Sequence, residues 1–273
     1  MEPRVWGIML AKDEADIIGT NLRHHMALGL SGIVVFDNMS RDSTGDIARS
    51  VPGVVVIQDP EPAFRQGEKN LAMTEIAMGS GADWVLAVDA DELWYPTRAE
   101  SIPDALASVG VDAFRARMLD HVCSAFDDES EADPVLRMRW RRSRPGGAKA
   151  AHRCSAGACV WGGNESVRTG DGDILDPPVR GCMLIRHYSV RGLRHLKRKA
   201  ANGWRAVSAP GVHRNACGHW RKWYMRWRSD PRAFEGYFSR KLVLDARRLR
   251  RRPLEWREDP FTPAHLRNRG GRA

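Results

Sequence analysis

The chain has 273 residues, of which 42% are hydrophobic and 28% charged, so it is long and apolar enough to bury one large core. No apolar run approaches the roughly 20 residues that a membrane-spanning helix needs, and the first residues lack the layout of a signal peptide. Five cysteines, an odd number at irregular spacing, do not indicate a disulfide framework. We therefore expect a cytoplasmic protein, neither integral to a membrane nor secreted.

The net charge of +9 is unevenly distributed along the chain. Residues 1–190 contain 20 Lys and Arg against 28 Asp and Glu, whereas residues 191–273 contain 23 against 6. An acidic body with a basic tail indicates a ligand site joined to a surface that meets anions. We expect an α/β domain over residues 1–190 and a basic helical extension over residues 191–273 that packs on it.

The first 95 residues alternate short apolar runs with helical patterns. Strands are predicted at residues 5–10, 33–36, 54–57 and 84–88, and helices at 17–28, 42–49 and 68–78, with Asp13 as a candidate cap of the first helix. Continuous apolar strands separated by helices are typical of a parallel sheet covered on both faces. The sequence thus predicts a mostly parallel α/β sheet with helices on both sides.

The pattern beyond residue 100 is weaker. We expect a helix at 102–109, strands at 113–118 and 183–185, and basic helices at 193–201, 220–227 and 233–251, while residues 120–163 show no clean period. Trp220, Trp223 and Trp227 follow at spacings of three and four residues. That spacing favours the packing of a helix into a core over a platform for sugar rings.

Carboxylates follow each of the four predicted parallel strands. In an open parallel sheet the ligand site lies at the carboxyl ends of the strands, and so many like charges there need a cation between them. Mg²⁺ or Mn²⁺ prefers carboxylate oxygens and leaves positions open for phosphate. The D-x-D pattern at Asp89 and Asp91 is common in surface turns, but here it follows an apolar strand. The four strand ends contribute Asp13 and Glu14, Asp37, Asp59, and Asp89, Asp91 and Glu92.

Several of these segments resemble family-2-type glycosyltransferases of the GT-A fold. The resemblance is most specific in residues 12–16 (KDEAD), 36–44 (FDNMSRDST) and 88–94 (VDADELW), and continues more loosely in 163–167 (GNESV), 187–191 (HYSVR) and 218–221 (GHWR). It extends over roughly residues 4–225. It implies a GT-A fold, a nucleoside-diphosphate sugar as donor, a divalent metal, and transfer to an acceptor with inversion at the anomeric carbon. Uridine diphosphate is the default nucleotide, with thymidine and guanosine diphosphates open.

The same resemblance implies roles for individual residues. Asp91, Asp89 and His187 would bind the metal, with Asp89 also close to the sugar. Arg65 and Lys69 would meet the donor or its diphosphate, and Arg191 and Lys199 would neutralise phosphate charge. The base and ribose of the donor would lie against Ala11, Lys12, Glu14 and Asp37, with further donor contacts from Asn38 and Ala90.

Two carboxylates are candidates for the general base that takes the proton of the acceptor hydroxyl. Glu165 stands where many members of the resembling subgroup have a histidine, so it serves either as the base or as a replacement for a binding residue. Asp120 follows the predicted strand at 113–118 and is the second candidate. The sequence leaves both open.

Two other functions compete with this interpretation. A sugar-phosphate nucleotidyltransferase would show a glycine-rich phosphate loop after the first strand, which residues 11–14 (AKDE) lack. The second competing function is that of a non-catalytic module that binds anions. The acceptor is open among small molecules, lipid-linked sugars, polysaccharides and peptides.

A run of arginines at residues 247–252 (RRLRRR) is the strongest cluster of charge. It forms either a solvated helix face or a contact with the anionic head groups of the inner membrane face. Nucleic acid is disfavoured as a partner, because no recognition motif accompanies the run.

Overall fold

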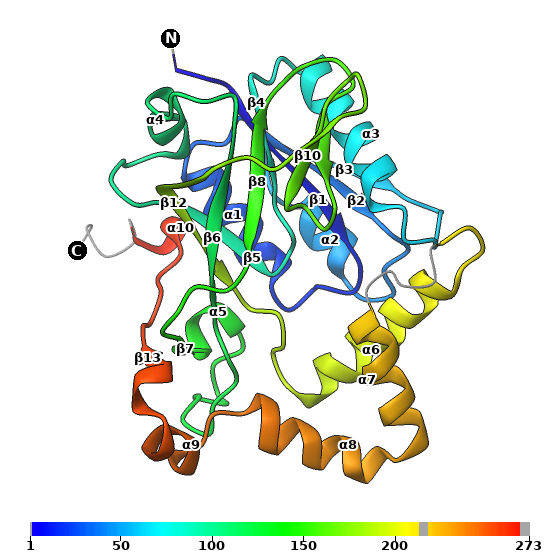
Figure 1. Ribbon diagram of the computed structural model, residues 1–273, viewed down its shortest axis with the longest axis vertical. Helices are drawn as coiled ribbons and strands as arrows, with labels where there is room; N and C mark the ends of the chain where they lie inside the picture. Colours follow the sequence, from blue (N-terminus) through cyan, green and yellow to red (C-terminus); the bar gives the residue numbers. More distant parts are fainter. Residues whose placement is uncertain (1, 213–217, 268–273) are drawn as a thin grey trace.

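An eight-stranded sheet forms the centre of the computed structural model, which describes residues 2–212 and 218–267 (Figure 1). The order of the strands is β3-β2-β1-β4-β8-β6-β12-β5. Their bounds are β1 (Val5–Ala11), β2 (Gly32–Asp37), β3 (Val54–Gln58), β4 (Trp84–Ala87), β5 (Glu92–Pro96), β6 (Ala113–Asp120), β8 (Ala148–Arg153) and β12 (Val179–His187).

The first four strands are parallel neighbours, as the sequence predicts. They are connected by helices α1 (Ile18–Ala27), α2 (Thr44–Arg49) and α3 (Gln66–Gly79). Gly32 begins β2 where a Cβ would lie 2.6 Å from the ring of Trp6, so only glycine lets β2 pass this buried side chain. The carboxyl ends of all four strands therefore lie along one edge of the sheet.

Each face of this sheet has its own apolar core, because alternate strand residues point to opposite sides. On one face, Val5 and Met9 of β1 and Leu86 of β4 pack with residues of α1, α2 and α4 (Ile102–Ala107). On the other face, Ile8 of β1 and Val85 of β4 pack with α3 and with β9 (Cys159–Trp161) and β10 (Ser166–Arg168). The predicted mostly parallel α/β sheet with helices on both faces is confirmed.

The second half of the sheet mixes strand directions. β8 is antiparallel to both β4 and β6, β12 is parallel to β6, and β5 closes the far edge antiparallel to β12. Residues 120–163, which show no clean period in the sequence, form a short helix and three strands, of which only β8 belongs to this sheet. The remaining elements are α5 (Pro134–Arg137), β7 (Trp140–Arg142), β11 (Ile174–Leu175), which pairs with β10, and β13 (Trp256–Glu258), which pairs with β7.

The C-terminal residues form a chain of helices that runs along the lower part of Figure 1 before returning to the sheet. None of the helices in the described ranges is both long and apolar enough to cross a bilayer. Their bounds are α6 (Leu193–Ser208), α7 (Gly218–Ser229), α8 (Pro231–Tyr237), the π-helical turn η1 (Phe238–Leu242), α9 (Ala246–Arg251), the 3₁₀ turn η2 (Pro253–Glu255) and α10 (Ala264–Arg267).

Two local predictions are wrong. Asp13 does not cap α1: it has a φ of 54° in the loop before that helix, and its carboxylate accepts a hydrogen bond from the Arg41 amide. The predicted helix at 233–251 is interrupted, because the Leu244 amide donates to the Cys123 carbonyl at 2.8 Å and Asp245 caps a new helix. Pairing with a distant loop thus overrides the local helical pattern. The helix predicted at 193–201 continues to Ser208.

Three buried polar residues of α1 attach this helix to the start of β5. Asn21 Nδ2 donates to the carbonyls of Ala90 and Glu92 at 3.1 and 2.7 Å. His25 Nε2 accepts from the Trp94 amide at 3.0 Å, and His24 Nε2 lies 2.8 Å from the Trp94 carbonyl. These bonds fix the segment that carries the D-x-D pattern against the core.

Acid should destabilise the protein through these histidines. Burial lowers the pKa of His25 from 6.5 to about 4, against the opposing effect of its hydrogen bond with the Asn21 carbonyl. Above pH 6.5 the ring is neutral in both states. Between pH 6.5 and 4 this histidine binds a proton in the unfolded chain but not in the folded chain. As the pH falls through this range, the free energy of unfolding therefore falls by up to about 1.4 kcal/mol per pH unit.

Urea unfolding between pH 7.5 and 4 measures this effect. In His25→Gln the free energy of unfolding should depend less steeply on pH, by an amount that corresponds to at most one bound proton. An unchanged slope in the variant would show that His25 is protonated without cost in the folded protein.

Candidate active site

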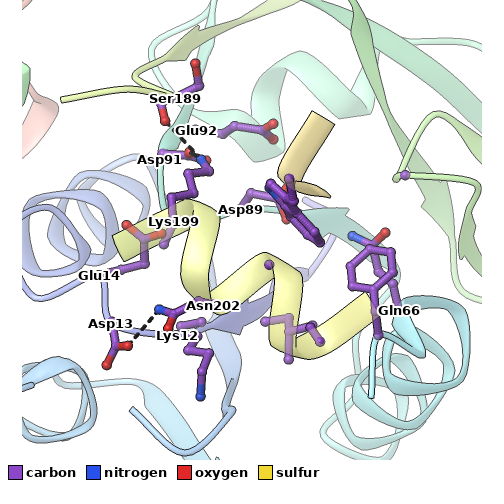
Figure 2. Close-up of a pocket in the computed structure, with 18 of the residues that line it drawn as sticks. Lys12, Asp13, Glu14, Gln66, Asp89, Asp91, Glu92, Ser189, Lys199 and Asn202 are labelled. Carbon is purple, nitrogen blue, oxygen red and sulfur yellow. Dashed lines mark hydrogen bonds and ion pairs between the residues drawn. The ribbon is translucent and has the colours of Figure 1, made fainter. Parts of the chain in front are cut away.

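A cavity of about 480 Å³ lies at the carboxyl ends of β1, β2 and β4, beneath α6 and α7, and we call it the strand-end pocket. Figure 2 shows Lys199 and Asn202 of α6 reaching across it toward the acidic strand ends. Of the residues predicted for the site, the pocket is lined by Ala11, Lys12, Glu14, Asn38, Asp89, Ala90, Asp91, Glu165, His187 and Lys199.

Five other predicted site residues do not line the pocket. Asp37 is buried and accepts hydrogen bonds from the Ser40 amide and Gln58, and Lys69 is buried in an ion pair with Asp59 at 2.6 Å. Arg65 is 43% exposed beside Glu68. Asp120 and Arg191 lie directly behind residues that do line the pocket, and each contacts one of them.

Asp91, Glu92 and His187 form a compact group on adjoining strands. Each offers one ligand atom, and these atoms lie within 4.8 Å of one another. The group depends on the pairing of β5 with β12, in which His187 stands opposite Glu92. Glu92 is 1% exposed, and its Oε2 atom has no hydrogen-bond partner within the described ranges. An orphaned carboxylate oxygen beside a second carboxylate and an imidazole fits a divalent cation.

Two lysines neutralise this acidic group. Lys199 of α6 donates to Asp91 at 2.6 Å, and Lys149 of β8 lies 2.9 Å from Asp89 and 3.3 Å from Glu92. Burial raises the pKa of Asp91, but Lys199 and His187 outweigh it and hold the pKa well below its usual range. Burial raises the pKa of Glu92 to about 7 against the opposing effect of Lys149.

Sequence reasoning misses Lys149. Only the antiparallel insertion of β8 between β4 and β6 brings it to the D-x-D segment. The available signal is weak: a single lysine within the alanine-rich run at 148–151, at a position that the sheet buries to 9% exposure. A lone charged residue within a small apolar run is typical of a paired, buried charge.

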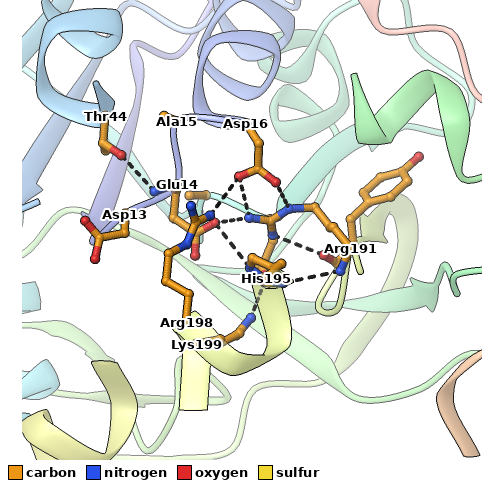
Figure 3. Close-up of polar contacts among 12 residues, drawn as sticks. Asp13, Glu14, Ala15, Asp16, Thr44, Arg191, His195, Arg198 and Lys199 are labelled. Carbon is orange, nitrogen blue, oxygen red and sulfur yellow. Dashed lines mark hydrogen bonds and ion pairs between the residues drawn. The ribbon is translucent and has the colours of Figure 1, made fainter. Parts of the chain in front are cut away.

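Arg191 joins the pocket to the loop after β1, as Figure 3 shows. Its fully buried guanidinium forms ion pairs with Glu14 and, at 2.8 Å, with Asp16. Burial raises the pKa of Asp16, but the hydrogen bond from Arg191 lowers it to about 2. Arg198 of α6 reaches the same carboxylate at 3.3 Å. Arg191 is therefore a support of the pocket wall.

The opposite end of the pocket is formed by the loops after β1 and β2. Lys12 Nζ donates to the carbonyls of Asn38 and Met39 at 2.5 and 3.1 Å, and Asn202 of α6 donates to Asp13 at 2.7 Å. These bonds hold the two strand ends and α6 together. The wall that results presents polar groups and backbone to the pocket.

The two candidate bases have different surroundings. Glu165 lines the pocket, and its carboxylate has no hydrogen-bond or ion-pair partner in the part of the chain that the structure describes. Asp120 instead accepts a hydrogen bond from His187 Nδ1 at 2.8 Å. Burial lowers the pKa of His187, but this hydrogen bond and Asp91 raise it above its ordinary value. Asp120 thus orients His187, and Glu165 is the carboxylate that can meet a substrate.

Aromatic side chains form the wall beneath α7. Trp220 and Trp223 line the pocket together with Phe64, whose ring lies 5.2 Å from that of Trp220 in a T-shaped arrangement. Trp220 packs over Gly203 of α6, where a Cβ would lie 2.3 Å from the indole. No residue of α7 is buried, so the predicted core packing of this helix is wrong. Trp220 and Trp223 instead cover the pocket.

Known proteins offer limited similarity. No protein-family model matches the chain, and no curated protein matches it. The solved structure of TarS 1-349 from S. aureus in complex with UDP is 18% identical with a TM-score of 0.33, over 45% of this chain and 36% of that one.

Glucosyl-3-phosphoglycerate synthase from Mycobacterium tuberculosis, in complex with Mn²⁺, UDP and glucosyl-3-phosphoglycerate, is 18% identical with a TM-score of 0.30. That match covers 43% of this chain and 44% of the other. The aligned regions thus span less than half of each neighbour, and the likeness by itself assigns no activity to this chain.

Replacing Arg191 should destabilise the fold strongly. Arg191→Met leaves the carboxylates of Glu14 and Asp16 without their buried partner, which typically costs about 3–5 kcal/mol. Arg198→Met is the matched control, because Arg198 is 34% exposed and forms only outer ion pairs with Asp16 and Asp42, worth about 0–1 kcal/mol. Urea unfolding at pH 7.5 compares the two variants, and equal losses would contradict the assignment of Arg191 as a support.

Proposed function

We propose that this protein is a metal-dependent glycosyltransferase that moves a sugar from a nucleoside-diphosphate sugar, favouring a UDP-sugar, to an acceptor hydroxyl with inversion. The observation that carries the proposal is the group of Asp91, Glu92 and His187 in a pocket at parallel strand ends, faced by the cations of Lys149 and Lys199. Carboxylates for a metal beside cations for phosphate are the combination that a nucleotide-sugar donor requires. The GT-A resemblance of the sequence motifs supports the same assignment.

Asp91, Glu92 and His187 would hold the metal, Mn²⁺ or Mg²⁺. When bound, such a cation offsets the charge that develops on the leaving diphosphate. Asp89 is engaged by Lys149 and by Asn164 Nδ2 at 3.2 Å, so we assign it to the sugar end of the donor or to the edge of the metal site. Lys199 and Arg198 of α6 both line the pocket, Lys199 beside Asp91 and Arg198 beside Asp16 and Asp42, and we assign them to the phosphates.

The nucleoside would lie at the other end of the pocket. Ala11, Lys12, Glu14 and Asn38 line that end. Asp37 would act indirectly, because its carboxylate accepts a hydrogen bond from the Ser40 amide and so holds the loop after β2 in place. Arg65 is exposed outside the pocket and would contribute only to its outer rim, whereas the buried Lys69 would act indirectly, by holding Asp59. Arg191 would act indirectly, by holding Glu14.

Glu165 is our choice for the general base. As the acceptor oxygen attacks the anomeric carbon, the Glu165 carboxylate takes the hydroxyl proton, and the bond from that carbon to the diphosphate breaks on the opposite side. The aromatic wall of Phe64, Trp220 and Trp223 borders the same pocket and would exclude water from the reacting groups.

The described cysteines, Cys123, Cys154, Cys159 and Cys182, are free thiols. Free thiols are typical of a reducing compartment, and we propose that the protein acts in the cytoplasm. We propose further that residues 1–190 act as the donor-binding domain and that residues 191–273 complete it, because α6 supplies Lys199 to the pocket.

Binding of a nucleoside diphosphate should stabilise the protein in a metal-dependent way. At a hundred times its dissociation constant a ligand adds about 2.7 kcal/mol, or a few degrees in Tm for a chain of this size. A thermal-shift panel of uridine, thymidine, guanosine, cytidine and adenosine diphosphates, with and without Mn²⁺, measures this. We expect the largest shift with UDP and Mn²⁺, and its loss in Asp91→Asn.

Asp46→Asn is the control for this panel, because Asp46 is an exposed carboxylate of α2 that pairs with Arg49 on the same helix. The absence of a shift with every nucleotide would overturn the nucleotide-sugar proposal.

Glu165→Gln and Asp120→Asn should separate the base from the positioning residue. Loss of a general base lowers kcat by about 10²–10⁴-fold. Loss of a hydrogen bond that orients a metal ligand instead lowers the affinity for the metal by about 10–100-fold. We expect the first result for Glu165→Gln and the second for Asp120→Asn, measured by UDP release from UDP-sugars over a Mn²⁺ titration. A larger fall in kcat for Asp120→Asn, at unchanged metal affinity, would reverse the assignment.

A further inference from the structure

The arginine-rich segment that begins with α8 forms a surface apart from the strand-end pocket. Residues 231–254 contain eight Arg and Lys against two Asp and Glu. We call this surface the basic edge and include in it Phe126 of the neighbouring loop. In Figure 1, α8 and α9 lie along the lower border of the molecule.

The two acidic residues of the basic edge do not neutralise it. Glu235 pairs with Lys197 of α6 at 2.8 Å, and Asp245 is used as the cap of α9. Arg247, Arg250 and Arg251 are exposed and have no ion-pair partner in the described ranges. Their charge is therefore uncompensated and directed to the surroundings.

Large apolar side chains protrude beside these arginines. Leu254 is 91% exposed, more than any other large hydrophobic residue in the described part of the chain, and Phe126 is 46% exposed. Phe126 belongs to this edge because the amide next to it, of Ala125, donates to the Leu244 carbonyl at 2.8 Å. The Phe126 ring contacts Trp140 at 5.9 Å between centroids and is still half-exposed, so Phe126 and Leu254 add apolar surface to an edge that is otherwise basic.

The turn that carries Leu254 is well supported. Pro253 begins it, the Glu255 carbonyl accepts a hydrogen bond from the Ser143 amide at 2.9 Å, and the next residue, Trp256, is buried where β13 pairs with β7. The guanidinium of Arg248 lies 4.9 Å from the Trp256 ring. Leu254 is thus held outward by ordered structure, with arginines immediately before it.

We propose that the basic edge docks the protein on an anionic lipid bilayer, with the arginines at the head groups and Leu254 and Phe126 entering the interface. Charge complementarity selects an anionic partner, and protruding apolar side chains favour a bilayer over nucleic acid, whose backbone offers them no apolar phase. The proposal is independent of the glycosyltransferase assignment, because it uses no residue of the strand-end pocket.

Co-sedimentation of the full chain with vesicles tests this proposal in the absence of nucleotide. Binding is expected to phosphatidylcholine vesicles that contain phosphatidylglycerol, and not to phosphatidylcholine alone. Each basic side chain near an anionic surface contributes about fivefold, so Arg250→Glu with Arg251→Glu should weaken binding by more than tenfold. Leu254→Ser should weaken it several-fold.

Matched controls keep the result specific. Arg98→Glu with Arg180→Glu reverses two exposed arginines on another part of the surface, and Ile174→Ser removes an apolar side chain that is 51% exposed on β11. Both control proteins should bind as the parent does. All substituted side chains are exposed, so unchanged circular dichroism and Tm verify folding.

Three results would overturn the proposal. The first is no binding to phosphatidylglycerol vesicles at physiological salt, and the second is equal loss of binding in the controls. The third is tighter binding to duplex DNA that is insensitive to Leu254→Ser, which would assign the basic edge to nucleic acid.

Discussion

The pairing of buried carboxylates with buried cations is the constraint on which the site depends. Asp91 and Glu92 are 6% and 1% exposed, and charges in such a position are tolerated only with partners. Lys149 of β8 and Lys199 of α6 supply these partners, and Arg191, from the loop before α6, does the same for Glu14. The fold therefore has to bring the second half of the chain over the strand ends of the first. The uneven charge of the sequence reflects this arrangement.

The position of the acidic group depends equally on neutral polar contacts. Asn21, His24 and His25 of α1 bind the backbone at the start of β5, so the segment that leaves β4 cannot move away from the core. β5 then pairs with β12 at the far edge of the sheet and places Glu92 opposite His187. Precise placement of ligand atoms requires such rigid support. The contacts around Asp91, Glu92 and His187 thus determine where these three side chains meet.

Helix α6 connects the site with the rest of the C-terminal region. It carries Lys199 and Asn202 toward the strand ends and Gly203 toward Trp220 of α7. Because α7 and α8 continue from this point to the basic edge, the pocket wall and the proposed membrane surface belong to one run of helices. A bilayer bound at that edge would lie near the helices that cover the pocket.

The sequence by itself determined the parallel β1–β4 half, because continuous apolar strands and helical apolar spacing are local patterns. It also located the acidic strand ends, because the topology of a parallel sheet places them on one edge. It also identified Asp91, His187, Lys199 and Glu165 as pocket residues. Only the tertiary structure decided which groups meet. Lys149 pairs with Asp89 because β8 runs antiparallel to β4. Asp120 accepts a hydrogen bond from His187, and Trp220 lines a pocket instead of a core. These contacts join residues far apart in the chain, so no local periodicity encodes them.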